Sequence, residues 1–509
     1  MENRFDNIPR EMFEFAQLND ALHDKKLETK ARSSFADAMV RFKKNKSSVV
    51  AAYIILLLVL FSIVSPFISP YSVKYMDKLY VNMPPYVESI ARKNWGILDG
   101  GVTRDSQNDA SMDYWQGIYE ETGMNPLIKV LSKQVKQVKQ RGKMVENATY
   151  KIKNNKYFET GIVYRVFSYD DFRKIMAWQN ETGIQVIYPF VETKDIQDIT
   201  NNPNIWYKVS DAKGKAVKDE NGAFIPAYST NKEIEGIPYE SIRIPGDDGS
   251  YIYSVRKSGS VSCRVCYYNL YIYENGFAPE YYFGTNEKGQ DLFCAIGMGA
   301  RFSLVFAVIV SAINLTIGAI YGSIEGYYGG VVDMTMERIS DILSGIPTIV
   351  AVTLFQLHMA QKVGTVPAFL FAFVLTGWIG MASLTRKQFY RFKGQEYVLA
   401  ARTLGASDWR LMFRHIFPNS LGTIITSCAM VIPGMISSET SLTYLGIVNL
   451  SEFVGTSIGE LMSQGQRAMT TAPHAMLFPA LFFSLLMISF NLFGNGLRDA
   501  FNPTTRGEE

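Results

Sequence analysis

The stretch VVAAYIILLLVLFSIVSPFI, residues Val49–Ile68, decides the fold because twenty consecutive residues carry no charge. At about 1.5 Å of rise per residue, a helix of this length spans the roughly 30 Å hydrocarbon core of a bilayer. A signal peptide does not fit, because a long polar segment precedes the stretch and no small-residue cleavage site follows it. We therefore expect a retained transmembrane helix over residues 48–69.

Five further stretches meet the same criteria of length and low charge. They lie near residues 302–322, 343–359, 366–384, 421–438 and 476–493. The composition agrees, since 47% of the 509 residues are hydrophobic and only 19% are charged, which is apolar for a soluble protein. We expect a polytopic α-helical membrane protein with six transmembrane helices.

Basic residues near the helix ends predict the orientation, because Lys and Arg accumulate in cytoplasmic loops. Residues 30–46 hold six basic side chains against one acid, and residues 386–414 hold seven basic side chains. We expect a multi-pass protein of the inner or plasma membrane with its N-terminal tail (1–47) and C-terminal tail (504–509) in the cytoplasm. The apolar face of Phe35, Met39 and Phe42 fits either an interfacial helix or an extension of the first transmembrane helix.

Residues 70–282 separate the first two predicted spans and contain few apolar runs. Their number and their polar composition indicate a folded extracytoplasmic domain. Alternation in Tyr251–Tyr273 predicts strands, whereas Asn125–Met144 resembles a basic surface helix with a Pro in its first turn. We expect a mixed α/β domain, followed by residues 283–503 with the remaining five spans.

A second informative stretch, EYVLAARTLGASDWRLMFRHIFPN at residues Glu396–Asn419, lies between the fourth and fifth spans. Its first nine residues favour a helix about 13 Å long, and Gly405 then favours the helix end because glycine accepts the left-handed conformation. Ser407 or Asp408 can cap a second helix, and Pro418 marks the entry to the next span. From these residues alone, a connector and a docking element for a partner remain open alternatives.

The order Ala400, Ala401, three residues, Gly405 resembles the cytoplasmic EAA motif of ABC importer permeases, whose helix couples to the ATPase subunit. The chain departs from that motif at Leu399, where Glu is expected, and carries its acid at Glu396. The resemblance implies a coupling loop at residues 386–419. Its implied contact residues are Glu396, Leu399, Ala400, Ala401, Gly405, Ala406, Ser407 and Pro418.

Further blocks resemble the C-type subunit of dipeptide and oligopeptide permeases. They are FGTNEKGQDLF (Phe283–Phe293), GARFSL (Gly299–Leu304), GYYGG (Gly326–Gly330) and FNLFGNGLRDAFNP (Phe490–Pro503). The resemblance covers about residues 30–72 and 282–503, in the order of the family. The domain of roughly 210 residues is a departure, because the corresponding external loop is much shorter in many such permeases.

The resemblance implies one transmembrane subunit of an ATP-driven oligopeptide importer. Its partners would be a B-type permease, two ATPase subunits that bind ATP and Mg²⁺, and an extracytoplasmic peptide-binding protein. A receptor or sensor with an external ligand-binding domain is the competing interpretation. An ion-coupled carrier is less favoured, because the predicted spans lack central charged groups and no internal repeat is visible.

Several chemistries find no support in the sequence. No G-x-x-x-x-G-K-[ST] phosphate loop occurs, so we expect no cofactor on this chain and no catalysis by it. The near-balanced charge, +3 at pH 7, and the lack of a basic aromatic groove disfavour nucleic acid. Cys263 and Cys266 have neither the companion Cys nor the His residues of a metal site, and a disulfide and two free thiols remain the alternatives. No peptide-contacting residue can be named.

Overall fold

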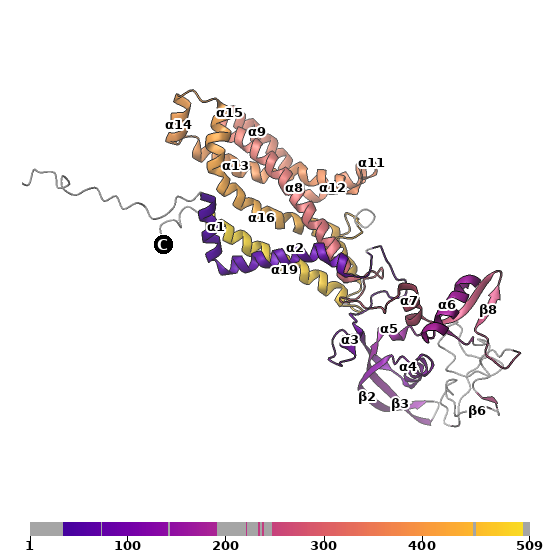
Figure 1. Cartoon of the computed structure of the whole chain (residues 1–509). Coiled ribbons are helices and arrows are strands. Elements are labelled where there is room, and N and C mark those ends of the chain that lie inside the picture. The colour runs from indigo at the N-terminus through magenta and orange to yellow at the C-terminus, as the bar shows by residue number, and fades with distance from the viewer. Residues whose placement is uncertain are drawn as a thin grey trace, which may run out of the picture.

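The computed structural model describes residues 34–501 except 73, 141–142, 191–219, 221–232, 235–236, 239–246 and 451–454. An elongated helical bundle carries a smaller α/β domain at one end (Figure 1). The long bundle helices are α2 (Lys46–Ile68), α8 (Leu292–Tyr328), α12 (Thr365–Gly377) with α13 (Ile379–Phe392), α16 (Phe417–Tyr444) and α19 (His474–Phe501). The shorter ones are α1 (Ser34–Lys44), α9 (Gly330–Ser344), α10 (Thr348–His358), α11 (Ala360–Val363), α14 (Glu396–Thr403), α15 (Asp408–Arg410), the π-helix Leu411–Ile416 and α18 (Ile458–Arg467).

The predicted membrane spans are present, but one of them is broken. Five helices of the described residues are long and apolar enough to cross a membrane, and α9 with α10 makes a sixth if the pair counts as one span. The two members of that pair are bent by 73°. The span expected at 343–359 is therefore wrong in its bounds, because Pro347 precedes α10 and the eleven residues of α10 reach only about 16 Å.

The helices also run beyond the apolar stretches that predicted them. α8 has 37 residues, about 55 Å, where 302–322 was expected. Residues 408–444 form one continuous span, because Pro418 lies in the first turn of α16 and does not end the helix. The loop expected at 386–419 therefore shrinks to residues 393–407. Apolarity marks only the part of a helix inside the bilayer, so it underestimates the helix length.

The bundle is held together by close helix contacts. α8 packs on α13, α2 and α16, and α19 packs on α2 and α16. Along α8, Gly318, Gly322 and Gly326 recur every four residues and face the backbone of α13. A Cβ added at Gly322 would lie 2.1 Å from the carbonyl oxygen of Ala382. Because small residues at this spacing let two helix backbones touch, this glycine seam fixes α8 against α13.

The N-terminal helix α1 is separate from the first transmembrane helix. It ends before Asn45, whose side-chain oxygen accepts a hydrogen bond from the backbone N–H of Ser48 and so caps α2. The buried side chains Ala38 and Phe42 pack on α19, with the rings of Phe42 and Phe493 edge to face at 5.4 Å. The first transmembrane helix therefore does not extend continuously into α1.

Residues between α2 and α8 form the inserted domain, a mixture of helices and strands as expected. One antiparallel sheet has the order β1 (Gly101–Gln107), β3 (Lys143–Asn155), β2 (Leu127–Gln140). A second contains β4 (Ile162–Ser168), β9 (Ser260–Cys266), β5 (Ile187–Tyr188) and β8 (Ser254–Lys257), and β6 (Glu233–Ile234) pairs with β7 (Ile237–Pro238). The helices are α3 (Glu88–Ala91), α4 (Asp109–Thr122), α5 (Lys156–Glu159), α6 (Tyr169–Thr182) and α7 (Tyr267–Asn275).

The surface helix expected at Asn125–Met144 is wrong, because this segment forms β2 and the start of β3. β2 pairs with β3 from Leu127 to Gln140, opposite Asn154 to Lys143. The spaced valines and lysines of this segment suit either period, and pairing with a distant strand decided the outcome. The strands expected in Tyr251–Tyr273 are β8 and β9, although the residues after Cys266 form helix α7.

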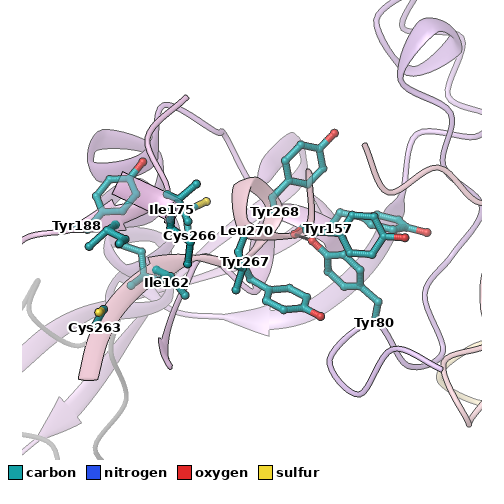
Figure 2. Packing of buried hydrophobic residues seen from close by; sticks show 14 of the residues in the cluster. Tyr80, Tyr157, Ile162, Ile175, Tyr188, Cys263, Cys266, Tyr267, Tyr268 and Leu270 are labelled. Carbon is teal, nitrogen blue, oxygen red and sulfur yellow. Dashed lines mark hydrogen bonds between the residues drawn. The ribbon is translucent and has the colours of Figure 1, made fainter. Parts of the chain in front are cut away.

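A cluster of tyrosines fills the core of the inserted domain and brings its helices and strands together (Figure 2). The ring of Tyr80 contacts those of Tyr157 and Tyr267 at 5.3 and 4.9 Å, and the hydroxyl of Tyr267 donates to Asp77 at 2.7 Å. Burial raises the pKa of Tyr80 well above its ordinary value. The cluster therefore holds neutral phenols as a packed aromatic core.

Cys263 and Cys266 are free thiols, so the disulfide alternative is not borne out. Both lie on β9, which pairs regularly with β4, and residues three apart on a strand point to opposite faces. Both are buried in the domain core, and burial raises the pKa of Cys263 to about 12 and that of Cys266 to about 11. They are unreactive packing residues.

Candidate functional site

The site begins with α14, at the end of the bundle away from the inserted domain (Figure 1). Glu396 lies in its first turn, where the helix dipole favours an acid. Gly405 follows with φ +82°, and the backbone N–H of Ala406 donates to the carbonyl of Ala401 at 3.1 Å. This left-handed turn confirms the predicted helix end at Gly405. The following Ser407 has an extended backbone and its carbonyl accepts from Leu411 at 2.9 Å, so the chain re-enters a helix at once.

Two long helices meet α14 through one tyrosine. The hydroxyl of Tyr327, near the end of α8, donates to Asp408 at 2.5 Å and accepts from the guanidinium of Arg402 at 3.2 Å. Asp408 opens the continuous span to Tyr444, and Arg402 lies on α14. Tyr327 thus joins α8, α14 and the 408–444 helix at a single point.

Apolar packing and a charge cluster support this junction. Buried side chains of α8, α13, α14 and the π-helix form one core there: Tyr327, Phe389, Val398, Leu411, Met412 and Ile416. Beside it, Arg386 of α13 binds Asp333 of α9 at 2.6 and 2.8 Å and Glu337 at 2.7 and 3.0 Å. The Lys393 ammonium donates to the carbonyl of Gly326 at 2.9 Å. α9, α13 and α8 are therefore connected at the same end of the bundle.

The two alanines of α14 do not share one outward face. Ala400 is exposed, whereas Ala401 is half-buried against the apolar core, as is Ala406. Large apolar side chains are exposed on α14 and directly after it, with Leu399 46% exposed in α14, Leu404 88% at its C-cap and Trp409 65% in α15. Of the other residues singled out in the sequence, Glu396, Gly405, Ser407 and Pro418 are exposed. The exposed surface of residues 396–409 is thus more apolar than the sequence motif indicated.

The buried carboxylate of Glu439 in α16 was not predicted from the sequence. Glu439 is 0% exposed and accepts from the hydroxyls of Ser303 at 2.7 Å, Thr440 at 3.3 Å and Thr443 at 3.4 Å. Ser303 belongs to α8, so the carboxylate ties α8 to α16. The predicted span ended at residue 438, one position before Glu439. Extending the predicted helix through residues 439–444 would have placed Glu439 inside the span.

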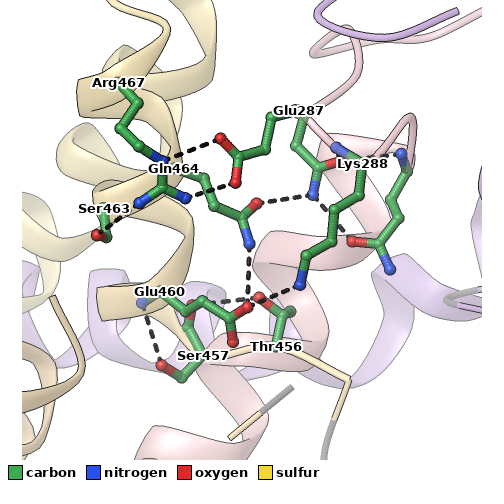
Figure 3. A network of polar contacts seen from close by, with 10 residues as sticks. Glu287, Lys288, Thr456, Ser457, Glu460, Ser463, Gln464 and Arg467 are labelled. Carbon is green, nitrogen blue, oxygen red and sulfur yellow. Dashed lines mark hydrogen bonds and ion pairs between the residues drawn. The ribbon is translucent and has the colours of Figure 1, made fainter. Parts of the chain in front are cut away.

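A polar cluster connects the entry to α8 with α18 (Figure 3). Lys288 binds Glu460 at 2.9 Å, Arg467 binds Glu287 at 2.5 Å, and the Asn286 amide donates to Gln464 at 3.2 Å. Three of these six side chains come from the FGTNEKGQDLF block. That block therefore builds a clamp between the inserted domain and the C-terminal part of the bundle.

Comparisons with known proteins identify the family. Residues 314–507 match the model of the binding-protein-dependent transport system inner membrane component, and residues 33–85 match that of the N-terminal TM domain of oligopeptide transport permease C. The oligopeptide transport system permease protein OppC of Bacillus subtilis (strain 168) is 40% identical over 229 residues, which cover 45% of this chain and 73% of that protein. The chain therefore belongs to the family of binding-protein-dependent transport system inner membrane components, and among these to the peptide permeases.

Two dipeptide transport system permease proteins DppC are also similar to this permease. That of Bacillus subtilis (strain 168) is 37% identical, covering 45% of this chain and 70% of its own. That of Lactococcus lactis subsp. cremoris (strain MG1363) is 36% identical, covering 46% and 67%. A solved chain of the MetNI methionine ABC transporter aligns at 14% identity over 41% of this chain and 96% of its own, with a TM-score of 0.34.

The family models place the site within this permease. Residues 314–507 include Tyr327, α14 and Glu439, and residues 33–85 include α1 and α2. Residues 86–313, which contain most of the inserted domain, lie outside both models. Nothing in these comparisons supports the receptor or sensor alternative.

Proposed function

We propose that the chain is the C-type transmembrane subunit of an ATP-driven, binding-protein-dependent oligopeptide importer. The observation that carries this proposal is its 40% identity to an oligopeptide permease over 73% of that protein. The subunit would pair with a B-type permease in the cell membrane. Two ATPase subunits would bind ATP and Mg²⁺ on the cytoplasmic side, where both termini and α14 would lie.

The exposed surface of residues 396–409, which contain α14, is the proposed contact with an ATPase subunit. Leu399, Leu404 and Trp409 expose apolar area on a polar connection between helices, which is typical of a protein-protein contact. A push on α14 would reach α8 through Tyr327 and the 408–444 helix through Asp408. These helices of about 55 Å would carry the motion to the other end of the bundle, as alternating access requires.

Leu404 gives the sharpest test of this contact, because it is 88% exposed and its replacement disturbs no packing within the chain. In the complete transporter, Leu404→Glu should lower peptide-stimulated ATP hydrolysis and peptide uptake several-fold. Leu404→Met keeps an apolar side chain and is the matched control. Normal coupling in Leu404→Glu, with the second permease still bound, would contradict the docking of an ATPase at α14.

We also propose that the inserted domain lies outside the cell and receives the peptide-binding protein or shapes the entrance for peptide. Its position at the end of the bundle opposite α14 supports this role (Figure 1). A deletion that tests it must spare the base of the domain, because the backbones of Asp77 and Asn82 bond to Gly289 and Asn286. Tyr86 and Tyr281 form an antiparallel bridge, so a short turn in place of residues 88–279 keeps the two chain ends of the base together. Tyr80→Ser in the shortened chain replaces the apolar ring that loses its contacts with Tyr157 and Tyr267.

The shortened permease should still assemble with its partners but lose delivery of peptide from the binding protein. Binding-protein-dependent uptake and copurification of the second permease measure the two properties separately. Unchanged uptake by the shortened permease would rule out both proposed roles of the domain.

A further inference from the structure

The bundle contains a cleft that the coupling loop, the clamp and the inserted domain do not use. Its volume is about 570 Å³, and it lies between α8, α13 and α16. This size is within the range of small-molecule sites in proteins. Residues that line it include Ser311 and Asn314 from α8, Met381 from α13, and Cys428 and Met435 from α16.

Two polar side chains in the wall of the cleft have unfilled hydrogen-bonding capacity. Asn314 is 1% exposed and Ser311 is 8% exposed. Within the described part of the chain, neither the Asn314 amide nor the Ser311 hydroxyl has a hydrogen-bond partner. A buried amide without a partner costs on the order of 1–3 kcal/mol, so a ligand that hydrogen-bonds to it would remove this cost.

The Asn314 amide lies against Gly377 of α12. A Cβ added at Gly377 would lie 2.3 Å from the Asn314 amide nitrogen, so only glycine at position 377 leaves room for the amide. Asn314 and Ser311 are three residues apart on α8 and therefore share one helix face. The two polar groups thus offer neighbouring donors and acceptors at the cleft.

The rest of the lining indicates which ligand would fit. Among the described residues, no charged side chain lines the cleft. Its walls are mostly apolar and include Met381 and Met435, whose unbranched side chains adapt to different shapes. A carboxamide both donates and accepts hydrogen bonds, as a peptide group does. Such a site suits a neutral peptide backbone and tolerates variable apolar side chains.

We propose that this cleft contacts the backbone of the transported peptide, with Asn314 and Ser311 hydrogen-bonding to its amide groups during passage. This inference rests on the proposed function of the chain as an oligopeptide permease. It adds the residues that touch the substrate, and it makes recognition at this point independent of peptide sequence.

Cys428 provides a natural probe for the test, because it lines the cleft and is partly exposed. The three other cysteines, Cys263, Cys266 and Cys294, are at most 1% exposed and should not react in the folded protein. In the complete transporter with its binding protein and ATP, penta-alanine should slow the reaction of Cys428 with a small charged methanethiosulfonate reagent. Penta-alanine offers a backbone with only methyl side chains, so protection would report on backbone contacts.

Asn314→Leu separates a ligand contact from a structural role. Leucine is similar in size and removes an unpartnered buried amide, so the variant should remain at least as stable as the wild type. The penta-alanine concentration needed for half protection of Cys428 should nevertheless rise about tenfold, as expected for the loss of one buried hydrogen bond. Asn491→Leu, an exposed site on α19, is the matched control and should leave that concentration unchanged.

Three results would overturn the proposal. Cys428 could react only with apolar reagents and regardless of penta-alanine, which would place the cleft against lipid. It could stay unreactive in every nucleotide state, which would place the cleft under the second permease. Finally, Asn314→Leu could leave protection unchanged. Uptake of penta-alanine by the wild type distinguishes these results from failure of the proposed function, which would appear as absent uptake.

Discussion

The glycine seam between α8 and α13 makes a quantitative prediction for Gly322→Ala. The added Cβ would lie 2.1 Å from the carbonyl oxygen of Ala382 and 2.9 and 3.0 Å from its carbonyl carbon and Cα. Ordinary contact begins at about 3.4 Å, so the backbones must separate by about 1.3 Å at this point. The atoms in the way belong to the backbone and cannot rotate aside. Overpacking of this kind costs about 1–3 kcal/mol of stability.

The assay is thermal unfolding of the purified permease in detergent, followed by peptide uptake after reconstitution. We expect Gly322→Ala to lower the apparent Tm by a few degrees or more and to reduce uptake. Gly422→Ala in α16 is the matched control, because its added Cβ would meet only the Phe501 ring at 3.6 Å. Alanine also favours a helix over glycine, so this control should be neutral or stabilising. If both variants unfold at the wild-type temperature, the α8–α13 contact is looser than the seam requires.

Three further predictions concern polar contacts. Tyr327→Phe removes the hydroxyl that joins Asp408 and Arg402, so uptake should fall while the second permease still copurifies. Tyr328→Phe, at a residue 53% exposed, is the control and should change neither property. In a double-mutant cycle of unfolding free energies, Lys288→Ala and Glu460→Ala should show a coupling of about 0.5–1 kcal/mol, because the pair is only partly exposed. Additive losses would show that the ion pair does not stabilise the fold. Glu439→Gln keeps an acceptor for the hydroxyls of Ser303 and Thr440 and should retain uptake. Glu439→Leu removes that acceptor and should lower both uptake and Tm. Equal behaviour of the two variants would contradict this tie between α8 and α16.

The sequence predicted the helices well where length and apolarity determine the structure. It failed where a distant partner decides, as in the strand Leu127–Gln140, which pairs with β3 and is not a helix. It also failed at the break before α10, because α9 carries Asp333 and Glu337 and does not resemble a membrane span.

At the candidate site, the sequence located α14 and the turn at Gly405 but not the way they are held. Glycine in a left-handed turn is a local property, and local properties can be predicted from neighbouring residues. The contact of Tyr327 with Asp408 joins residues 81 apart, and the contact of Ser303 with Glu439 joins residues 136 apart. Neither has a signal in a single sequence. For the same reason, Ala401 was expected on the outer face, although it packs inward on a core formed by four helices.

The contacts around α8 constrain how the bundle can move. One end of α8 follows Asp291, whose carboxylate accepts from the Ser69 hydroxyl at 2.6 Å, and the other end carries Tyr327 at the junction with α14. The glycine seam joins α8 to α13 between Gly318 and Gly326, because backbone atoms meet there without side chains between them. The cleft adjoins the seam, because Met381 of α13 both lies next to Gly318 and lines the cleft, where side chains facing α16 leave about 570 Å³ unfilled. If α14 is displaced, we expect α8 and α13 to move as one body and their contact with α16 to change between its two ties, Tyr327–Asp408 and Ser303–Glu439. That motion would widen or narrow the cleft that contains Asn314.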